Sequence, residues 1–220
     1  MANRAEQKAR TRNALIDSWL GIIGSGVNFA SISLREVAKA AGVVPTSFYR
    51  HFDDMDELGL AVVDELGLDL RRLTRGSFDA SQSMDANIRR GVGVYQRYVV
   101  DNAESVEFVN QARTGGTPAL RGAIDSELSY FSTRIAGALR ALVPGLKPSE
   151  RDTVAQLILA VLLENTTALL AVPTKSRALQ GEFRQELEDK MRVIMLGAEQ
   201  LGTVSSPTRK PRQTPQPSAL

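Results

Sequence analysis

The sequence contains no cysteine and a single histidine, His51, among its 220 residues. Without cysteine the chain can form neither a disulfide framework nor a cysteine-ligated metal site, and one histidine excludes a multi-histidine zinc cluster. The chain also lacks a Gly-rich phosphate-binding loop and a cysteine nucleophile. These gaps argue against an enzyme, so we expect no catalytic residues, no metal and no resident cofactor.

The amino-terminal segment lacks the basic region and the apolar core of roughly 7–15 residues that together form a signal peptide. It is instead a charged arm from Arg4 to Arg12. With 43% apolar and 24% charged residues, the chain has the composition of a soluble globular protein of one or two domains. We therefore expect a cytoplasmic protein.

Positive charge is concentrated at the two ends of the chain. Residues 1–52 carry seven basic and three acidic residues, whereas residues 53–202 carry 17 basic and 22 acidic residues. The last 18 positions, 203–220, add three more basic residues. A basic head on an acidic body is the distribution expected of a protein that docks one end on a polyphosphate such as DNA.

Apolar residues recur at helical spacing along the chain, and no alternating run is long enough to indicate a sheet. The sequence therefore predicts an all-α protein of about nine helices. Their expected ranges are 7–24, 34–41, 45–51, 55–75, 84–100, 103–112, 117–142, 149–171 and 178–201.

We expect three segments in this chain. Residues 1–54 would form a helix-turn-helix DNA-binding domain, and residues 55–202 a helical domain for ligand binding and dimerisation. The segment 203–220 holds four prolines and few apolar residues, which is typical of a disordered basic tail.

Residues 154–172 form the longest apolar stretch. This stretch is barely long enough for a membrane span and contains Glu164 and Asn165, which would be costly at a bilayer centre. We therefore predict a buried helix packed on more than one side and no membrane association. Helices near 149–171 and 178–201 are candidates for a homodimer interface, because two from each subunit would make a four-helix bundle; alternatively, both close the monomer core.

The segment SLREVAKAAGVVPTSFYRHF, residues 33–52, has the features of two short helices joined by a tight turn. Ser33 and Glu36 have the spacing of a capping box, Gly42 suits a helix end, and Pro45 suits the first turn of the next helix. Phe48 would pack inward, which leaves hydroxyl, phenol and guanidinium groups outside. Such a surface fits the DNA major groove, which is about 12 Å wide.

Residues 11–60 resemble the DNA-binding domain of TetR-family transcriptional regulators. The resemblance is carried by SLREVAKAAG at 33–42, PTSFYRHF at 45–52 and DELGL at 56–60. With RAEQKARTR at 4–12, these segments are most similar to the subgroup of repressors of unsaturated fatty-acid synthesis and of desaturase genes. The resemblance implies a nine-helix homodimer that binds a palindromic double-stranded DNA operator and a small-molecule signal.

The resemblance also implies the residues that contact DNA. These are Ser33, Arg35, Thr46, Ser47, Tyr49, Arg50 and His51. We expect Arg50 and Ser47 to touch bases, because a guanidinium can bond guanine O6 and N7 together, and the others to grip phosphates. Alternatively, Tyr49 is partly buried against the first helix, and His51 packs at the end of its own helix. Val44 stands where many relatives have a serine that caps the recognition helix, so one side-chain cap is absent.

The subgroup resemblance implies a small apolar effector, a long-chain acyl-coenzyme A or acyl carrier derivative. Such a ligand needs an apolar tunnel with a basic mouth. Candidate lining residues are Val94, Tyr98, Phe108, Val109, Phe131, Leu157, Val161 and Leu162, and candidate mouth residues are Arg113, Arg121 and Arg134. Alternatively, the lining residues are part of the ordinary core, and the mouth residues are solvated surface residues. Glu164 and Asn165 must find partners at the dimer seam or in the pocket.

Two other classes of function stay open at this point. A TetR-type repressor of an efflux or metabolic operon would respond to a different apolar molecule. A general DNA-coating protein would bind random and operator DNA equally.

Overall fold

The computed structural model describes residues 4–76 and 78–205. Every regular element within these ranges is helical, which confirms the all-α prediction. The elements are α1 (Arg4–Gly24), η1 (Phe29–Ser31), α2 (Leu34–Ala40), α3 (Pro45–Phe48), α4 (Met55–Leu73), α5 (Met84–Asp101), α6 (Ala103–Gly115), α7 (Pro118–Leu142), α8 (Pro148–Ala171) and α9 (Arg177–Ser205).

The predicted helices agree with the observed ones to within a few residues at most ends. The third helix is shorter than predicted and ends at Phe48, because the chain continues as a turn through His51. The last helix is longer and ends at Ser205, three residues into the segment expected to be a tail. Residues 206–220, the rest of that expected tail, lie outside the described residues.

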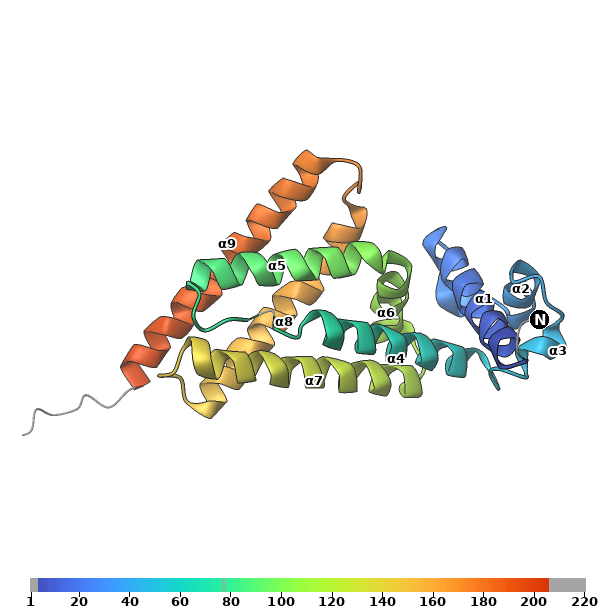
Figure 1. Ribbon diagram of the computed structural model, residues 1–220, viewed down its shortest axis with the longest axis horizontal. Helices are drawn as coiled ribbons and strands as arrows, with labels where there is room; N and C mark the ends of the chain where they lie inside the picture. Colours follow the sequence, from blue (N-terminus) through green and yellow to red (C-terminus); the bar gives the residue numbers. More distant parts are fainter. Residues whose placement is uncertain (1–3, 77, 206–220) are drawn as a thin grey trace, which may run out of the picture.

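The first three helices form a small head at one end of the molecule, and α4 leads from it into a larger body of α4 to α9 (Figure 1). The head is closed by apolar side chains that its helices point inward, including Leu15, Trp19, Val37, Phe48 and Phe52. In the body, α7 packs on α8, and α9 packs on α5 and α8. The head is thus a compact support for α2 and α3.

The head and the body share one apolar core. Phe108 of α6 is fully buried and lies against two head residues, with ring centroids 4.7 Å from Trp19 and 5.4 Å from Phe29. The backbone N–H of Phe29 also donates to Gln111 Oε1 of α6 at 3.0 Å. Movement of α4 or α6 is therefore mechanically linked to the head.

Helix α8 is less buried than the sequence predicts. It packs on α5, α6, α7 and α9, yet only 22% of its most apolar 18-residue stretch is buried within the single chain. By length and composition alone, α8 is long and apolar enough to cross a membrane. The predicted packing on more than one side is confirmed, but the prediction of a buried helix is wrong for the isolated chain, because residues such as Leu157 remain exposed.

Candidate nucleic-acid interface and apolar cavity

Ser33 and Glu36 form the predicted capping box at the start of α2. The backbone N–H of Ser33 donates to Glu36 Oε2 at 2.7 Å, and the N–H of Glu36 donates to Ser33 Oγ at 3.3 Å. The hydrogen bonds from Ser33 lower the pKa of Glu36, so its carboxylate remains ionised as an acceptor at neutral pH. The two-way bonding fixes the orientation of α2.

The turn after α2 also has the predicted chemistry. Gly42 adopts φ +69°, a conformation that favours glycine, and the N–H of Val43 reaches back to Ala38 O at 2.9 Å. Pro45 occupies the first turn of α3, and Val44 supplies no side-chain cap. The path of the chain into α3 therefore depends on the glycine and the proline.

The outer side of this unit carries the residues predicted to contact DNA. Phe48 and Phe52 are buried, with 0% and 3% exposure, whereas Tyr49 is 60% exposed. Ser33, Arg35, Thr46, Tyr49 and Arg50 are exposed, and Ser47 and His51 are half-buried. All seven predicted residues thus lie at the surface of the head.

His51 lies in a strongly basic environment. Partial burial is the main cause that lowers the pKa of its imidazole, and the charges of Lys8, Arg12 and Arg50 lower it further. The buried Nδ1 of His51 has no hydrogen-bond partner among the described residues. This corner of the head is a site of positive potential, as contact with a phosphate backbone requires.

Arg12 belongs to the charged arm, yet it is tied to the body. Its Nη1 lies 2.6 Å from Glu65 Oε1 of α4, and its guanidinium lies 5.4 Å from the centre of the Phe52 ring. The contact spans more than fifty positions in sequence, so no local pattern indicated it. Arg12 fixes α1 against α4.

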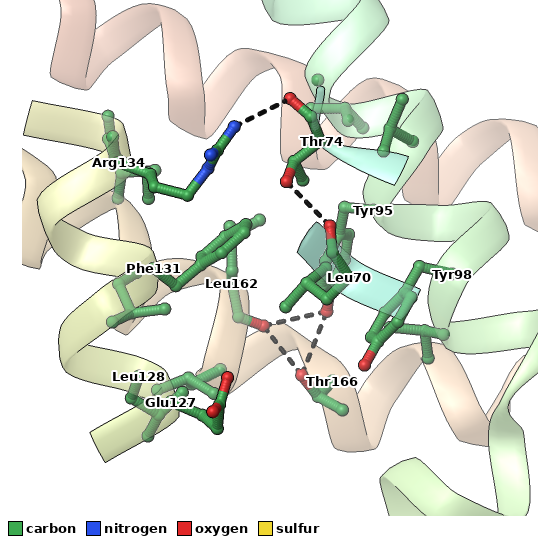
Figure 2. A pocket seen from close by; sticks show the side chains of 18 of the residues that line it. Leu70, Thr74, Tyr95, Tyr98, Glu127, Leu128, Phe131, Arg134, Leu162 and Thr166 are labelled. Carbon is green, nitrogen blue, oxygen red and sulfur yellow. Dashed lines mark hydrogen bonds between the residues drawn. The ribbon is translucent and has the colours of Figure 1, made fainter. Parts of the chain in front are cut away.

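A cavity of about 250 Å³ lies inside the body, surrounded by α4, α5, α6, α7, α8 and α9. Its wall is mainly apolar, with a few polar groups at defined places (Figure 2). Seven of the predicted ligand-binding residues line it: Val94, Tyr98, Val109, Arg113, Phe131, Arg134 and Leu162.

Four predicted ligand-binding residues are not part of the cavity wall. Phe108 points into the core shared with the head, and Leu157 is 51% exposed on the outer face of α8. Val161 packs against the apolar core formed by α5, α7, α8 and α9. Arg121 donates from Nη1 to the carbonyl of Gly116, which holds it at the start of α7. Helical spacing identifies apolar faces but does not say which of them encloses a space.

The contributions of α4 and α9 to the wall were not predicted from the sequence. Leu66, Leu70 and Thr74 line the cavity from one face of α4, and Met191 and Met195 line it from α9. The spacing of four residues in both sets is a signal that could have indicated a common face.

Neutral polar side chains in the wall are hydrogen-bonded within the protein. The hydroxyl of Tyr95 donates to Leu162 O at 2.9 Å and lies 3.1 Å from Thr166 Oγ1, and Thr166 in turn donates to Leu162 O at 3.0 Å (Figure 2). Tyr98 donates to Leu66 O at 3.0 Å. Burial raises the pKa of both phenols, so they stay protonated donors at neutral pH.

Three further neutral side chains of the wall are also hydrogen-bonded. Asn87, at the start of α5, accepts from the N–H of Asp79 and donates to its carbonyl, each at 2.9 Å. Asn110 donates to Thr167 Oγ1 at 2.9 Å, and Thr74 donates to Leu70 O at 2.7 Å. Among charged groups, Glu127 is paired with Arg71 of α4.

The two polar residues of the apolar stretch in α8 have different environments. Asn165 is buried, donates to Val161 O at 2.7 Å and accepts from Lys190 Nζ at 2.8 Å, so it links α8 to α9. Glu164 is exposed. Neither residue lines the cavity.

Residues 26–62 match the family described as bacterial regulatory proteins, tetR family. This match begins just after α1 and covers η1, the helix-turn-helix unit and the start of α4. The observed N-terminal helix-turn-helix and C-terminal helical body correspond to the predicted fold class.

Solved structures of such regulators share the fold over most of the chain. A TetR-like transcriptional regulator from Rhodococcus sp. RHA1 is 16% identical, with a TM-score of 0.67 over 90% of this chain and 100% of the other. A second Rhodococcus regulator is 22% identical, with a TM-score of 0.61 over 87% and 97%.

The fatty acid degradation regulator FadR from Bacillus halodurans is also similar, at 16% identity and a TM-score of 0.65 over 83% of this chain and 96% of the other. At these identities the likeness shows the fold alone. The described chain thus has the fold of these regulators, and its residues 26–62 match the tetR family.

Proposed function

We propose that this protein is a cytoplasmic, ligand-responsive transcriptional repressor that binds a palindromic DNA operator as a homodimer. The observation that carries this proposal is the capped α2–turn–α3 unit, which buries its two phenylalanines and exposes Tyr49 and Arg50. Arg50 and Ser47 contact bases, while Ser33, Arg35, Thr46, Tyr49 and His51 contact phosphates or flank them.

The dimer interface is formed by α8 and α9. Val193, Leu196, Leu201 and Val204 are exposed and lie on one stripe of α9, and the exposed Leu157 lies on α8. Exposed apolar side chains on two neighbouring helices support an interaction between subunits. Two heads would then reach successive major grooves, roughly 34–36 Å apart.

The effector is a small apolar molecule held in the cavity. Resemblance to the fatty-acid subgroup favours a long-chain acyl-coenzyme A, and the regulated genes would then be those of fatty-acid synthesis or desaturation. The cavity volume of about 250 Å³ lies just below the roughly 300–1,000 Å³ typical of ligand pockets, so it suits the acyl chain and leaves the coenzyme outside. The second candidate is a regulator of an efflux or metabolic operon with another apolar effector, which the same apolar wall supports.

Operator selection followed by affinity measurement tests the DNA-binding part. Selected palindromic DNA should bind at least tenfold tighter than random DNA of the same length, and affinity should fall steeply with salt because several phosphates are contacted. Equal affinity for both would indicate a general DNA-coating protein instead. Light scattering should give the mass of a dimer, and Val193→Glu should shift it towards the monomer while Leu68→Glu on α4 leaves it unchanged.

Native mass spectrometry of protein purified from a bacterial host tests the effector. A retained acyl species would identify the ligand class directly. A thermal-shift comparison of hexadecanoyl- and octadecenoyl-coenzyme A with aromatic drugs separates the two candidates, since only the matching class should raise the Tm.

A further inference from the structure

The chemistry left open in the cavity wall limits what kind of molecule can bind there. Six neutral polar side chains of the described residues line the wall, and each is hydrogen-bonded to another protein group: Thr74, Asn87, Tyr95, Tyr98, Asn110 and Thr166. A ligand that accepted hydrogen bonds from these groups would have to break the bonds that they already donate. A ligand group that only accepts hydrogen bonds, such as an anion, is therefore best recognised by the charged residues.

Within the part of the chain that the structure describes, three charged side chains line the cavity, and only one of them is in an ion pair. Glu127 pairs with Arg71, which also stacks 4.9 Å from the centre of the Tyr130 ring. Arg113 and Arg134 form no ion pair with any carboxylate in the described part of the chain. A half-buried guanidinium beside apolar groups favours an anion, because charge-assisted hydrogen bonds are the strongest it can form.

The wall contributed by α7 has different charges at its two ends. Figure 2 shows Arg134 and Glu127 at opposite ends of this wall, with Phe131 and Leu128 between them. The two charged residues are two helical turns apart, about 10 Å along the helix axis. An elongated ligand with one anionic end would therefore place that end at Arg134 and its apolar part along Phe131 and Leu128.

Arg134 is also in contact with the end of α4. Its Nη2 donates to the carbonyl oxygen of Thr74 at 3.5 Å, and Thr74 is the C-cap of α4 (Figure 2). The bond is long, although a cation near a helix C-terminus is favourable. An anion offers Arg134 shorter bonds, of about 2.7–2.9 Å, and would draw it from this carbonyl.

The other end of α4 is part of the head. Asp54 Oδ1 accepts from the N–H of Glu57 at 2.8 Å to begin the helix, and Leu58 and Val62 are buried in the core that contains Phe48 and Phe52. A change at Thr74 therefore acts on a helix that is anchored in the DNA-binding head.

We propose that Arg134 binds the anionic head group, a carboxylate or a phosphate, of an amphipathic effector, and that this exchange of partners changes the position of α4. Arg134 is thus both the residue that selects the head group and the residue that couples the cavity to the head. The coupling of the cavity to the head rests on the proposed function. The selection of the head group does not, because it can be measured without DNA.

The test compares three probes with one chain length, dodecanoate, 1-dodecanol and dodecanoyl-coenzyme A, by calorimetry on the full chain. The parent should bind at least one anionic probe tenfold or more tighter than the alcohol, and the better anion distinguishes a carboxylate from a phosphate head. Arg134→Gln should remove this preference while alcohol binding persists, Arg134→Lys should restore part of it, and Arg140→Gln, at an exposed position of α7 outside the cavity wall, should retain it. Equal binding of acid, thioester and alcohol by the parent, or loss of the preference in Arg113→Gln alone, overturns the assignment.

A second measurement addresses coupling. The preferred anionic probe should change operator affinity of the parent by about 5- to 150-fold, and this ratio should fall to near 1 in Arg134→Gln. A ratio that is unchanged in Arg134→Gln overturns the coupling. Absence of operator binding by the parent would instead contradict the proposed function, while the calorimetry would still decide the role of Arg134. Circular dichroism confirms that each variant is folded, and Arg134→Lys serves if Arg134→Gln is not.

Discussion

The outer surface of α2 and α3 presents hydroxyl and guanidinium groups to solvent, whereas the cavity in the body is enclosed by apolar side chains from six helices. The surface is built by residues 33–52 alone and is held by a capping box and a glycine turn. The cavity needs residues from Val63 to Met195. A substitution on the surface should therefore act at one interface, while a substitution near the cavity can act on the body, the head or both.

The largest expected effect is at the contact between the two regions. Phe108→Ala should lower the free energy of unfolding by about 3–5 kcal/mol, because it leaves a void beside Trp19 and Phe29 in the shared core. Urea unfolding followed by circular dichroism measures the change. Leu68→Ala, on an exposed part of α4, is the control and should cost less than about 1 kcal/mol. Equal effects of the two variants would mean that head and body are independent.

A smaller effect, confined to the surface, is expected from Arg50→Ala. Loss of a base contact should weaken operator binding by roughly 5- to 100-fold and reduce discrimination between related sites. Fluorescence anisotropy with labelled operator measures both. Arg113→Ala, in the cavity wall, should leave binding by the unliganded protein unchanged. Operator affinity equal to that of the parent would refute the assignment of Arg50 as a base-reading residue.

The helix caps of the surface should give effects of about 1 kcal/mol in opposite directions. Ser33→Ala removes the capping box of α2 and should destabilise the protein by about 1 kcal/mol. Val44→Ser adds a hydroxyl at the N-cap of α3, which has no side-chain cap, and should stabilise it by up to about 1 kcal/mol. Thermal unfolding of both variants gives the sign, and a loss of stability in Val44→Ser would show that α3 cannot accept a capping side chain.

The smallest effect concerns pH and His51. Its folded-state pKa is lowered from 6.5, so the stability contributed by the neutral imidazole is fully present above pH 6.5 and is lost as the pH falls through the folded-state value. The Tm of the parent should therefore fall more on acidification from pH 7.5 to 5.5 than that of His51→Gln. A larger fall in the Tm of His51→Gln than in that of the parent would show that the folded protein does not disfavour the charged imidazole. A bound phosphate should favour the charged form, so operator affinity should rise over the same change in pH.

The surface could be predicted in detail because its determinants are local. Ser33, Glu36, Gly42 and Pro45 each act on groups a few residues away, and their roles follow from sequence spacing. The all-α fold and its helix ends followed from the same kind of pattern.

The cavity could be predicted only in part. Val109 and Phe108 are neighbours on α6, both apolar, yet one lines the cavity and the other is buried in the shared core. Their different positions depend on how α6 is rotated between α1, α4 and α7, which is decided by contacts far apart in sequence. The ion pair between Arg12 and Glu65 and the low burial of α8 also depend on contacts far apart in sequence, so they were not predicted.

Trp19 is the one tryptophan of the chain and is 1% exposed where the head meets Phe108 of α6. Its indole emission therefore comes from a single, dry location, free of overlapping signals from other indoles. Any rearrangement that separates α1 from α6 admits water there and moves the emission to longer wavelength. The intrinsic fluorescence of Trp19 therefore reports on the junction between head and body, and it can be followed in real time without a dye and without DNA.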